Sequence, residues 1–68
     1  MTLDQCLGHP LVWLRTEQAE FPFTVSVADE AWLIRLNDFP VEPLYSLIID
    51  GHEIGDFDDW PTCWQRPD

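Results

Sequence analysis

The most unusual local feature of the sequence is a cluster of acidic residues near its C-terminal end. Five carboxylates surround one imidazole there: Asp50, His52, Glu53, Asp56, Asp58 and Asp59. Carboxylate and imidazole groups bind divalent cations, so one hypothesis is a weak metal site. The spacing does not match a calcium loop, which needs alternate carboxylates, a central glycine and a final glutamate. We therefore assign no metal ligand and keep Asp50, His52, Glu53 and Asp56 as candidates.

The same cluster also suits a protein-binding surface. Aromatic side chains are interleaved with the acids, and an aromatic anchor beside charged groups is typical of binding hot spots. The candidate interaction residues are Asp50, Glu53, Asp56, Phe57, Asp58, Asp59, Trp60 and Trp64. The alternative is that the aromatic residues belong to the core and the acids form a solvated edge. A binding role predicts solvent exposure for some of Trp13, Phe39, Trp60 and Trp64.

No arrangement of residues indicates catalysis. His9 and His52 have no spaced ligand partner and no adjacent nucleophile, and Ser26 and Ser46 lie in strand-like patterns. A nucleophilic serine would instead lie on a sharp strand-to-helix turn. The three glycines form no phosphate-binding loop. We therefore expect a protein that is not an enzyme and uses no cofactor.

The charge of the chain restricts its partners. Thirteen acidic residues face three arginines and no lysine, which gives a formal net charge of −10. Binding to nucleic-acid phosphates, or to an anionic membrane, requires clustered basic side chains. We expect neither. Charge would instead steer the protein toward a basic partner or a metal ion, although the acids also suit the simpler task of keeping an aromatic-rich chain soluble.

Length and cysteine content indicate one small domain. The 68 residues are close to the lower limit for folding around a hydrophobic core, and four Trp and four Phe supply much of that core. Cys6 and Cys63 have no metal or redox spacing, and whether they pair is left open. No signal-peptide pattern is visible. We expect a bacterial-type cytoplasmic protein.

Alternating apolar residues predict a mainly β fold, with a small α+β fold as the alternative. The pattern favours one antiparallel meander sheet of four or five strands in a single domain over residues 1–68. The expected strands are Leu11–Thr16, Phe23–Val27, Ala31–Leu36, Leu44–Ile49 and a last strand from His52. A helix longer than a turn or two is excluded near the N-terminus by Gly8 and Pro10.

Turn chemistry gives the clearest local prediction. Asp50-Gly51 lies between two apolar segments, which is the strongest short-range signal for a tight hairpin. Such a turn would place Ile49 opposite His52 and Leu47 opposite Ile54. After the hairpin, acidic residues before Pro61 favour a short C-terminal helical turn.

Three functions follow from these observations. The first is a non-enzymatic protein-interaction module that binds a basic protein or forms a homodimer. The second is an inhibitor or immunity-type protein that neutralises a basic nuclease or DNA-binding protein by acidic mimicry. The third is weak binding of a divalent metal.

Overall fold

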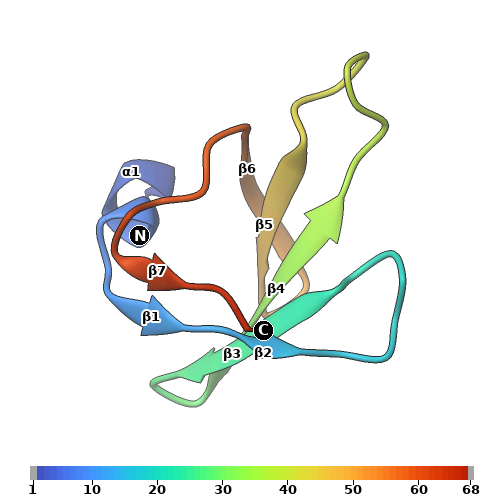
Figure 1. Ribbon diagram of the computed structural model, residues 1–68. Coiled ribbons are helices and arrows are strands. Elements are labelled where there is room, and N and C mark those ends of the chain that lie inside the picture. The colour runs from blue at the N-terminus through green and yellow to red at the C-terminus, as the bar shows by residue number, and fades with distance from the viewer. Residues whose placement is uncertain (1, 68) are drawn as a thin grey trace.

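A computed structural model describes residues 2–67 and shows a five-stranded antiparallel sheet in the order β2-β3-β4-β5-β6 (Figure 1). The strands of this sheet are β2 (Leu14–Arg15), β3 (Phe23–Val27), β4 (Glu30–Leu36), β5 (Tyr45–Ile49) and β6 (His52–Phe57). Each strand pairs with the next one along the chain, so the sheet is a meander. The predicted fold class is therefore confirmed.

The predicted first strand is divided between two sheets. Its first part, β1 (Leu11–Val12), pairs in parallel with β7 (Trp64–Gln65), and its second part is β2 of the meander. Trp13 lies between the two parts and donates its backbone N–H to the Gln65 carbonyl oxygen at 3.0 Å. The alternation expected along this segment holds, because Leu11 and Trp13 are buried while Val12 and Leu14 are exposed.

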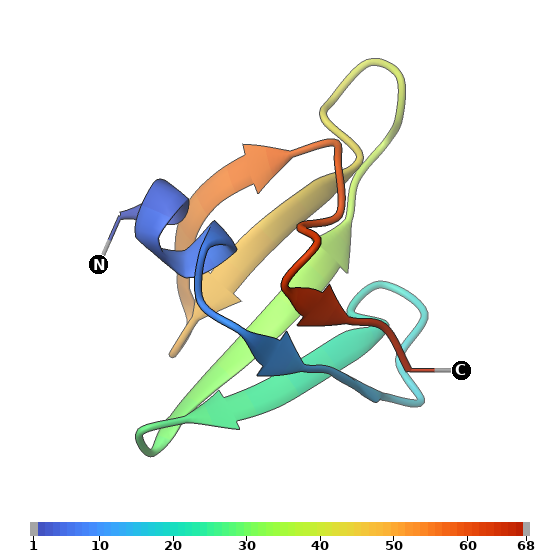
Figure 2. The same cartoon turned by 60° about the vertical axis from the view of Figure 1, so that its left-hand side comes forward.

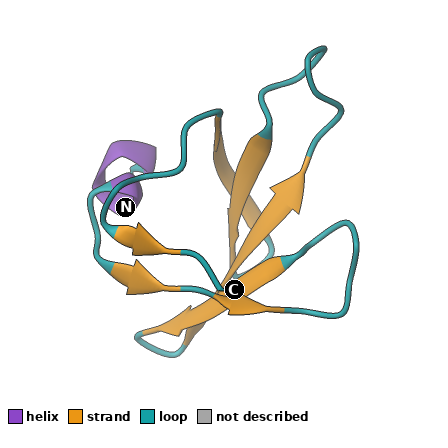
Figure 3. Ribbon diagram, in the orientation of Figure 1, coloured by secondary structure: helices purple, strands orange, loops and turns teal. Residues whose placement is uncertain are grey.

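One short helix, α1 (Leu3–Leu7), precedes β1 (Figure 3). Thr2 caps its first turn through a reciprocal pair of hydrogen bonds with Gln5, which satisfies backbone donors that a helix start leaves free. Near the C-terminus, the Trp64 N–H donates to the Pro61 carbonyl oxygen at 3.1 Å. The helical turn expected there is thus a single hydrogen-bonded turn. After this turn the chain forms β7 and not a longer helix, because the backbone of residues 63–65 pairs with β1 and Trp13.

The core lies between the meander and a second layer made of the chain ends. Figure 2 shows α1, β1 and β7 together on one side of the five-stranded sheet. Six aromatic rings meet between the layers, with centroid separations from 5.0 to 6.1 Å: Trp13, Phe23, Tyr45, Phe57, Trp60 and Trp64. Each fully buried large apolar side chain contributes about 1.5–3 kcal/mol, so this aromatic cluster supplies a large part of the stability.

The predicted tight hairpin joins β5 to β6. Asp50 and Gly51 have φ values of 52° and 85°, and Ile49 lies opposite His52, as expected. The expected pairing of Leu47 with Ile54 is wrong, because an irregularity after Leu47 shifts the register and places Gly55 opposite it. Gly55 also lies under α1, where a Cβ atom would come within 2.8 Å of Leu3 Cδ2. The absence of a side chain there allows the helix to pack closely on β6.

Candidate functional site

The structure divides the predicted acidic cluster among three places. Asp50 lies in the turn before β6, and Asp58 and Asp59 follow the opposite end of that strand. Six strand residues at about 3.3 Å each separate the two ends by about 20 Å. Between them, Glu53 and Asp56 pair with Ile48 and Ser46, on the face of the sheet that points away from α1. The eight candidate interaction residues therefore do not form one surface.

The aromatic members of that candidate set belong to the core. Phe57 and Trp64 are 8% and 3% exposed, and Trp60 is half-buried against both Trp13 and Trp64. The indole N–H of Trp60 donates to the Trp64 carbonyl oxygen at 3.0 Å. Of the four aromatic residues proposed as contacts, only Phe39 is largely exposed. For Phe57 and Trp64, the structure supports the alternative assignment to the core.

A different acidic site forms where two turns of the meander meet. In a meander, every second turn lies at the same end of the sheet, so the β3–β4 turn at Ala28-Asp29 lies next to the β5–β6 turn at Asp50-Gly51. The backbone N–H of Asp50 donates to the Ala31 carbonyl oxygen at 2.9 Å. This hydrogen bond holds the second turn against the start of β4. We call this region the sheet-end site.

The sheet-end site contains a pocket of about 300 Å³, lined by Glu30, Trp32, Ile49, Asp50, His52 and Ile54. Trp32 and Ile49 are buried, whereas Glu30, Asp50 and His52 are exposed. The pocket thus has an apolar base and a rim with two carboxylates and one imidazole. Apolar lining with a few converging polar groups is the usual composition of a ligand pocket.

The environment of Trp32 is unusual for a core tryptophan. The side chain is 1% exposed, and its indole N–H has no hydrogen-bond partner among residues 2–67. The ring of His9 packs against it edge-on, with the centroids 6.1 Å apart. Buried indole N–H groups usually find an acceptor. Trp32 therefore lines the pocket while its indole N–H stays unpaired within residues 2–67 and closed to solvent.

The metal hypothesis finds no geometric basis. Within the described chain, no three His, Cys, Asp or Glu side chains lie close enough to one another to hold a metal ion. Asp50 and His52 are at the sheet-end site, but Asp56 accepts a hydrogen bond from Ser46 on the outer face. The candidate ligands Asp50, His52, Glu53 and Asp56 do not converge on one point.

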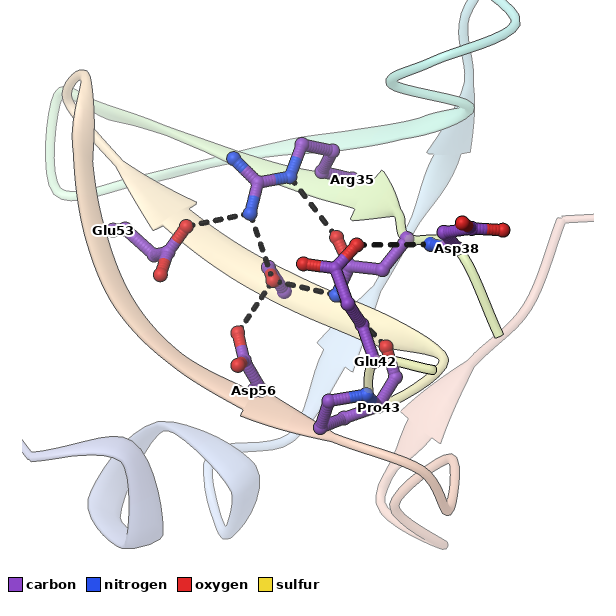
Figure 4. Close-up of polar contacts among 8 residues, drawn as sticks. Arg35, Asp38, Glu42, Pro43, Glu53 and Asp56 are labelled. Carbon is purple, nitrogen blue, oxygen red and sulfur yellow. Dashed lines mark hydrogen bonds and ion pairs between the residues drawn. The ribbon is translucent and has the colours of Figure 1, made fainter. Parts of the chain in front are cut away.

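A polar network covers the outer face of β4, β5 and β6, and its centre is the fully buried Ser46. The Ser46 hydroxyl donates to Asp56 at 2.5 Å and accepts from the Asn37 amide at 2.8 Å and from Arg35 at 3.2 Å. The Arg35 guanidinium reaches Glu53 at 2.6 Å (Figure 4). Because Ser46 is closed to solvent, the network serves to hold the sheet and the β4–β5 loop together.

Each of the three arginines is held by other parts of the chain. Arg35 belongs to the network, Arg15 donates to the Pro67 carbonyl oxygen, and Arg66 lies over the Trp60 ring, 5.0 Å from its centroid. Arg66 also donates to the Tyr45 hydroxyl at 3.1 Å. Arg35–Glu53 is the one ion pair found in residues 2–67. The other described carboxylates form no ion pair within residues 2–67.

Four of the six residues that line the pocket are absent from the set predicted from the sequence: Glu30, Trp32, Ile49 and Ile54. The predicted meander could have indicated that Glu30 lies near Asp50, because it places the β3–β4 and β5–β6 turns at the same end of the sheet. The network residues Arg35, Asn37 and Ser46 could be found only once the register was known, since Arg35 lies directly opposite Ser46.

No protein-family model, no curated protein and no solved structure matches the chain. Among residues 2–67, no helix is both long enough and apolar enough to cross a bilayer.

Proposed function

We propose that this protein is a non-enzymatic interaction module that binds a basic partner protein through the sheet-end site. The observation that carries this proposal is the imbalance of charge on the surface. The arginines are all engaged within the fold, and Arg35–Glu53 is the only ion pair among the described residues. An acidic surface of this kind attracts cationic proteins and raises their association rate.

The sheet-end site supports this function more strongly than the other acidic places. Asp58 accepts a hydrogen bond from the Leu44 backbone at 2.9 Å, and Glu53 and Asp56 are occupied by the outer-face network. Asp29, Glu30 and Asp50 are exposed, and no hydrogen bond or ion pair of their side chains is found within residues 2–67. Glu30 and Asp50 line a pocket with an apolar base, where a partner can also bury surface.

Affinity capture from the native cell tests the proposal. The bait is the whole protein, and the wash contains about 50 mM or about 500 mM salt, because screening at high salt weakens charge-driven binding. We expect a basic protein, with a pI above about 9, to be retained at low salt and released at high salt. The identity of that protein distinguishes a nuclease or DNA-binding target from other basic partners.

Two matched variants locate the binding surface. Asp29→Asn, Glu30→Gln and Asp50→Asn together remove three charges from the sheet end. Asn tolerates the positive φ of positions 29 and 50. The control combines Glu17→Gln, Glu20→Gln and Asp59→Asn, which removes the same charge from exposed positions elsewhere. We expect the first variant to lose the partner and the control to keep it. Equal loss in both, or retention at high salt, would contradict the proposal.

A further inference from the structure

We infer that the sheet-end pocket binds the side chain of an arginine residue presented by the partner. This inference rests on the proposed function and adds the chemical group that the pocket recognises. It depends on the size of the pocket, its apolar base and the charges at its rim.

The size of the pocket restricts what it can hold. Its volume of about 300 Å³ lies at the lower end of the range for ligand pockets, which is about 300–1,000 Å³. One side chain fits such a space better than a cofactor does. The apolar base formed by Trp32, Ile49 and Ile54 suits the methylene stem of a long cationic side chain, which packs on apolar surface while its charged end meets polar groups.

The rim selects a cation, and its geometry favours a guanidinium. Glu30 begins β4, Asp50 lies in the β5–β6 turn, and both line the same pocket. The bond from the Asp50 N–H to the Ala31 carbonyl oxygen holds the β5–β6 turn beside the start of β4. A planar guanidinium has five N–H donors and can bond two carboxylates at once, whereas an ammonium acts as a compact point charge. Two carboxylates on the rim of one pocket therefore favour arginine over lysine.

Trp32 contributes to the apolar base of the pocket. Its indole N–H has no partner among residues 2–67, and the same holds for Trp13, which does not line the pocket. Both indole nitrogens are closed to solvent, so neither is available to a ligand. The arginine side chain is therefore recognised by the acidic rim and the apolar base.

The test is a titration of the 15N-labelled protein with acetyl-Gly-Arg-Gly-amide, followed by 1H–15N correlation NMR. Acetyl-Gly-citrulline-Gly-amide is the matched control, because citrulline has nearly the same shape as arginine without the charge. The Trp32→Phe variant assigns the Trp32 indole resonance. We expect saturable shifts of the Trp32 indole and of the His52 and Ile54 amides with the arginine peptide, and none with the citrulline peptide.

Variants connect these shifts to the rim. We expect Glu30→Gln and Asp50→Asn each to weaken binding by up to about fivefold, the upper range for one exposed ion pair, and Asp59→Asn to leave it unchanged. The dispersion of each spectrum shows whether the variant is folded. Equal shifts with citrulline, shifts centred elsewhere, no saturable shift, or equal affinity for acetyl-Gly-Lys-Gly-amide would overturn the inference.

This experiment and the affinity capture fail independently. If the arginine peptide does not bind but a basic partner still requires the sheet-end carboxylates, the pocket inference is wrong and the proposed function stands. If the peptide binds and no basic protein is captured, the pocket recognises arginine but the proposed function is wrong.

Discussion

The backbone N–H of Asp50 lies 2.9 Å from the carbonyl oxygen of Ala31, and this hydrogen bond joins the tight turn of one hairpin to the second strand of another. Asp50 has a positive φ of 52°, and Gly51 after it has a φ of 85°. The turn therefore determines where the Asp50 carboxylate lies relative to Glu30. Changes that strain this turn act on both stability and the sheet-end site.

Gly51→Ala should destabilise the protein. No atom lies within 4 Å of the Cβ that alanine would add, so the cost comes from the positive φ alone, at about 1–2 kcal/mol. The matched control is Gly8→Ala, where φ is −90° and the nearest atom to the new Cβ is 3.6 Å away. That change should leave stability unaltered or raise it by up to about 1 kcal/mol. Urea unfolding followed by tryptophan fluorescence measures both, and equal effects would show that the turn is not strained.

Ser46→Ala should cost about 1–3 kcal/mol of unfolding free energy. The hydroxyl is fully buried and holds Arg35, Asn37 and Asp56 in one network, so its removal leaves buried polar groups without a partner. Ser26→Ala is the control, because Ser26 is exposed on β3 and should change stability by less than about 0.5 kcal/mol. Chemical denaturation distinguishes the two. A cost for Ser46→Ala no larger than the control would mean that the network adds nothing.

Cys63 should react with thiol reagents faster than Cys6 in the folded protein. Both cysteines are free, but Cys6 is fully buried while Cys63 is only partly so. Burial is the main cause that raises the pKa of the Cys6 thiol, and the Glu30 carboxylate adds to it. Fewer reactive thiolates form at a site of this kind. Mass spectrometry after brief alkylation should find Cys63 modified first, and simultaneous modification of both would show that Cys6 is accessible.

The same raised pKa predicts a loss of stability in alkali. In the unfolded chain the Cys6 thiol ionises near its ordinary pKa of 9.0, while in the folded protein it holds its proton to a higher pH. The resulting stabilisation is fully present below about pH 9 and is lost as the pH rises through the folded-state pKa. Urea midpoints at about pH 8 and about pH 10 should fall less in Cys6→Ala than in the wild type. Equal falls would show that Cys6 does not contribute.

Added sodium chloride should stabilise the protein. A net charge of −10 with one ion pair in residues 2–67 leaves mutual repulsion among the carboxylates, which opposes the compact state. Raising the ionic strength from about 0.01 M to 0.15 M shortens the screening length from about 30 Å to about 8 Å. The melting temperature should therefore rise with salt, and rise less in the Glu17→Gln, Glu20→Gln, Asp59→Asn variant. A fall with salt would mean that Arg35–Glu53 outweighs the repulsion.

Local patterns predicted much of the meander. Phe23–Val27 forms a strand with the predicted bounds, and the Asp50-Gly51 turn forms as expected. Both depend on neighbouring residues only, since side-chain alternation and the φ preferences of a turn act over a few positions. The pairing of β1 with β7 joins segments more than fifty residues apart. No local pattern specifies it, because it follows from where Trp13 and Trp64 bury their rings.

The candidate site was predicted less completely than the fold. The sequence places Asp50 and His52 in the acidic cluster, and both line the pocket. Asp58, Asp59, Phe57 and Trp64 lie elsewhere, because β6 carries the chain to the far end of the sheet and the core takes the rings. Closeness along an extended strand is a poor measure of closeness in space, since each residue advances by about 3.3 Å.

By itself, the sequence determined a small acidic β domain, its tight hairpin and an excess of carboxylates over basic groups. Composition and short-range geometry suffice for these properties. Only the tertiary structure decided which carboxylates remain free and which meet at a pocket. That outcome depends on strand register and on the stacking of two turns, which are set when distant apolar side chains bury one another. The acidity is therefore a property of the chain, and the sheet-end site is a property of the fold.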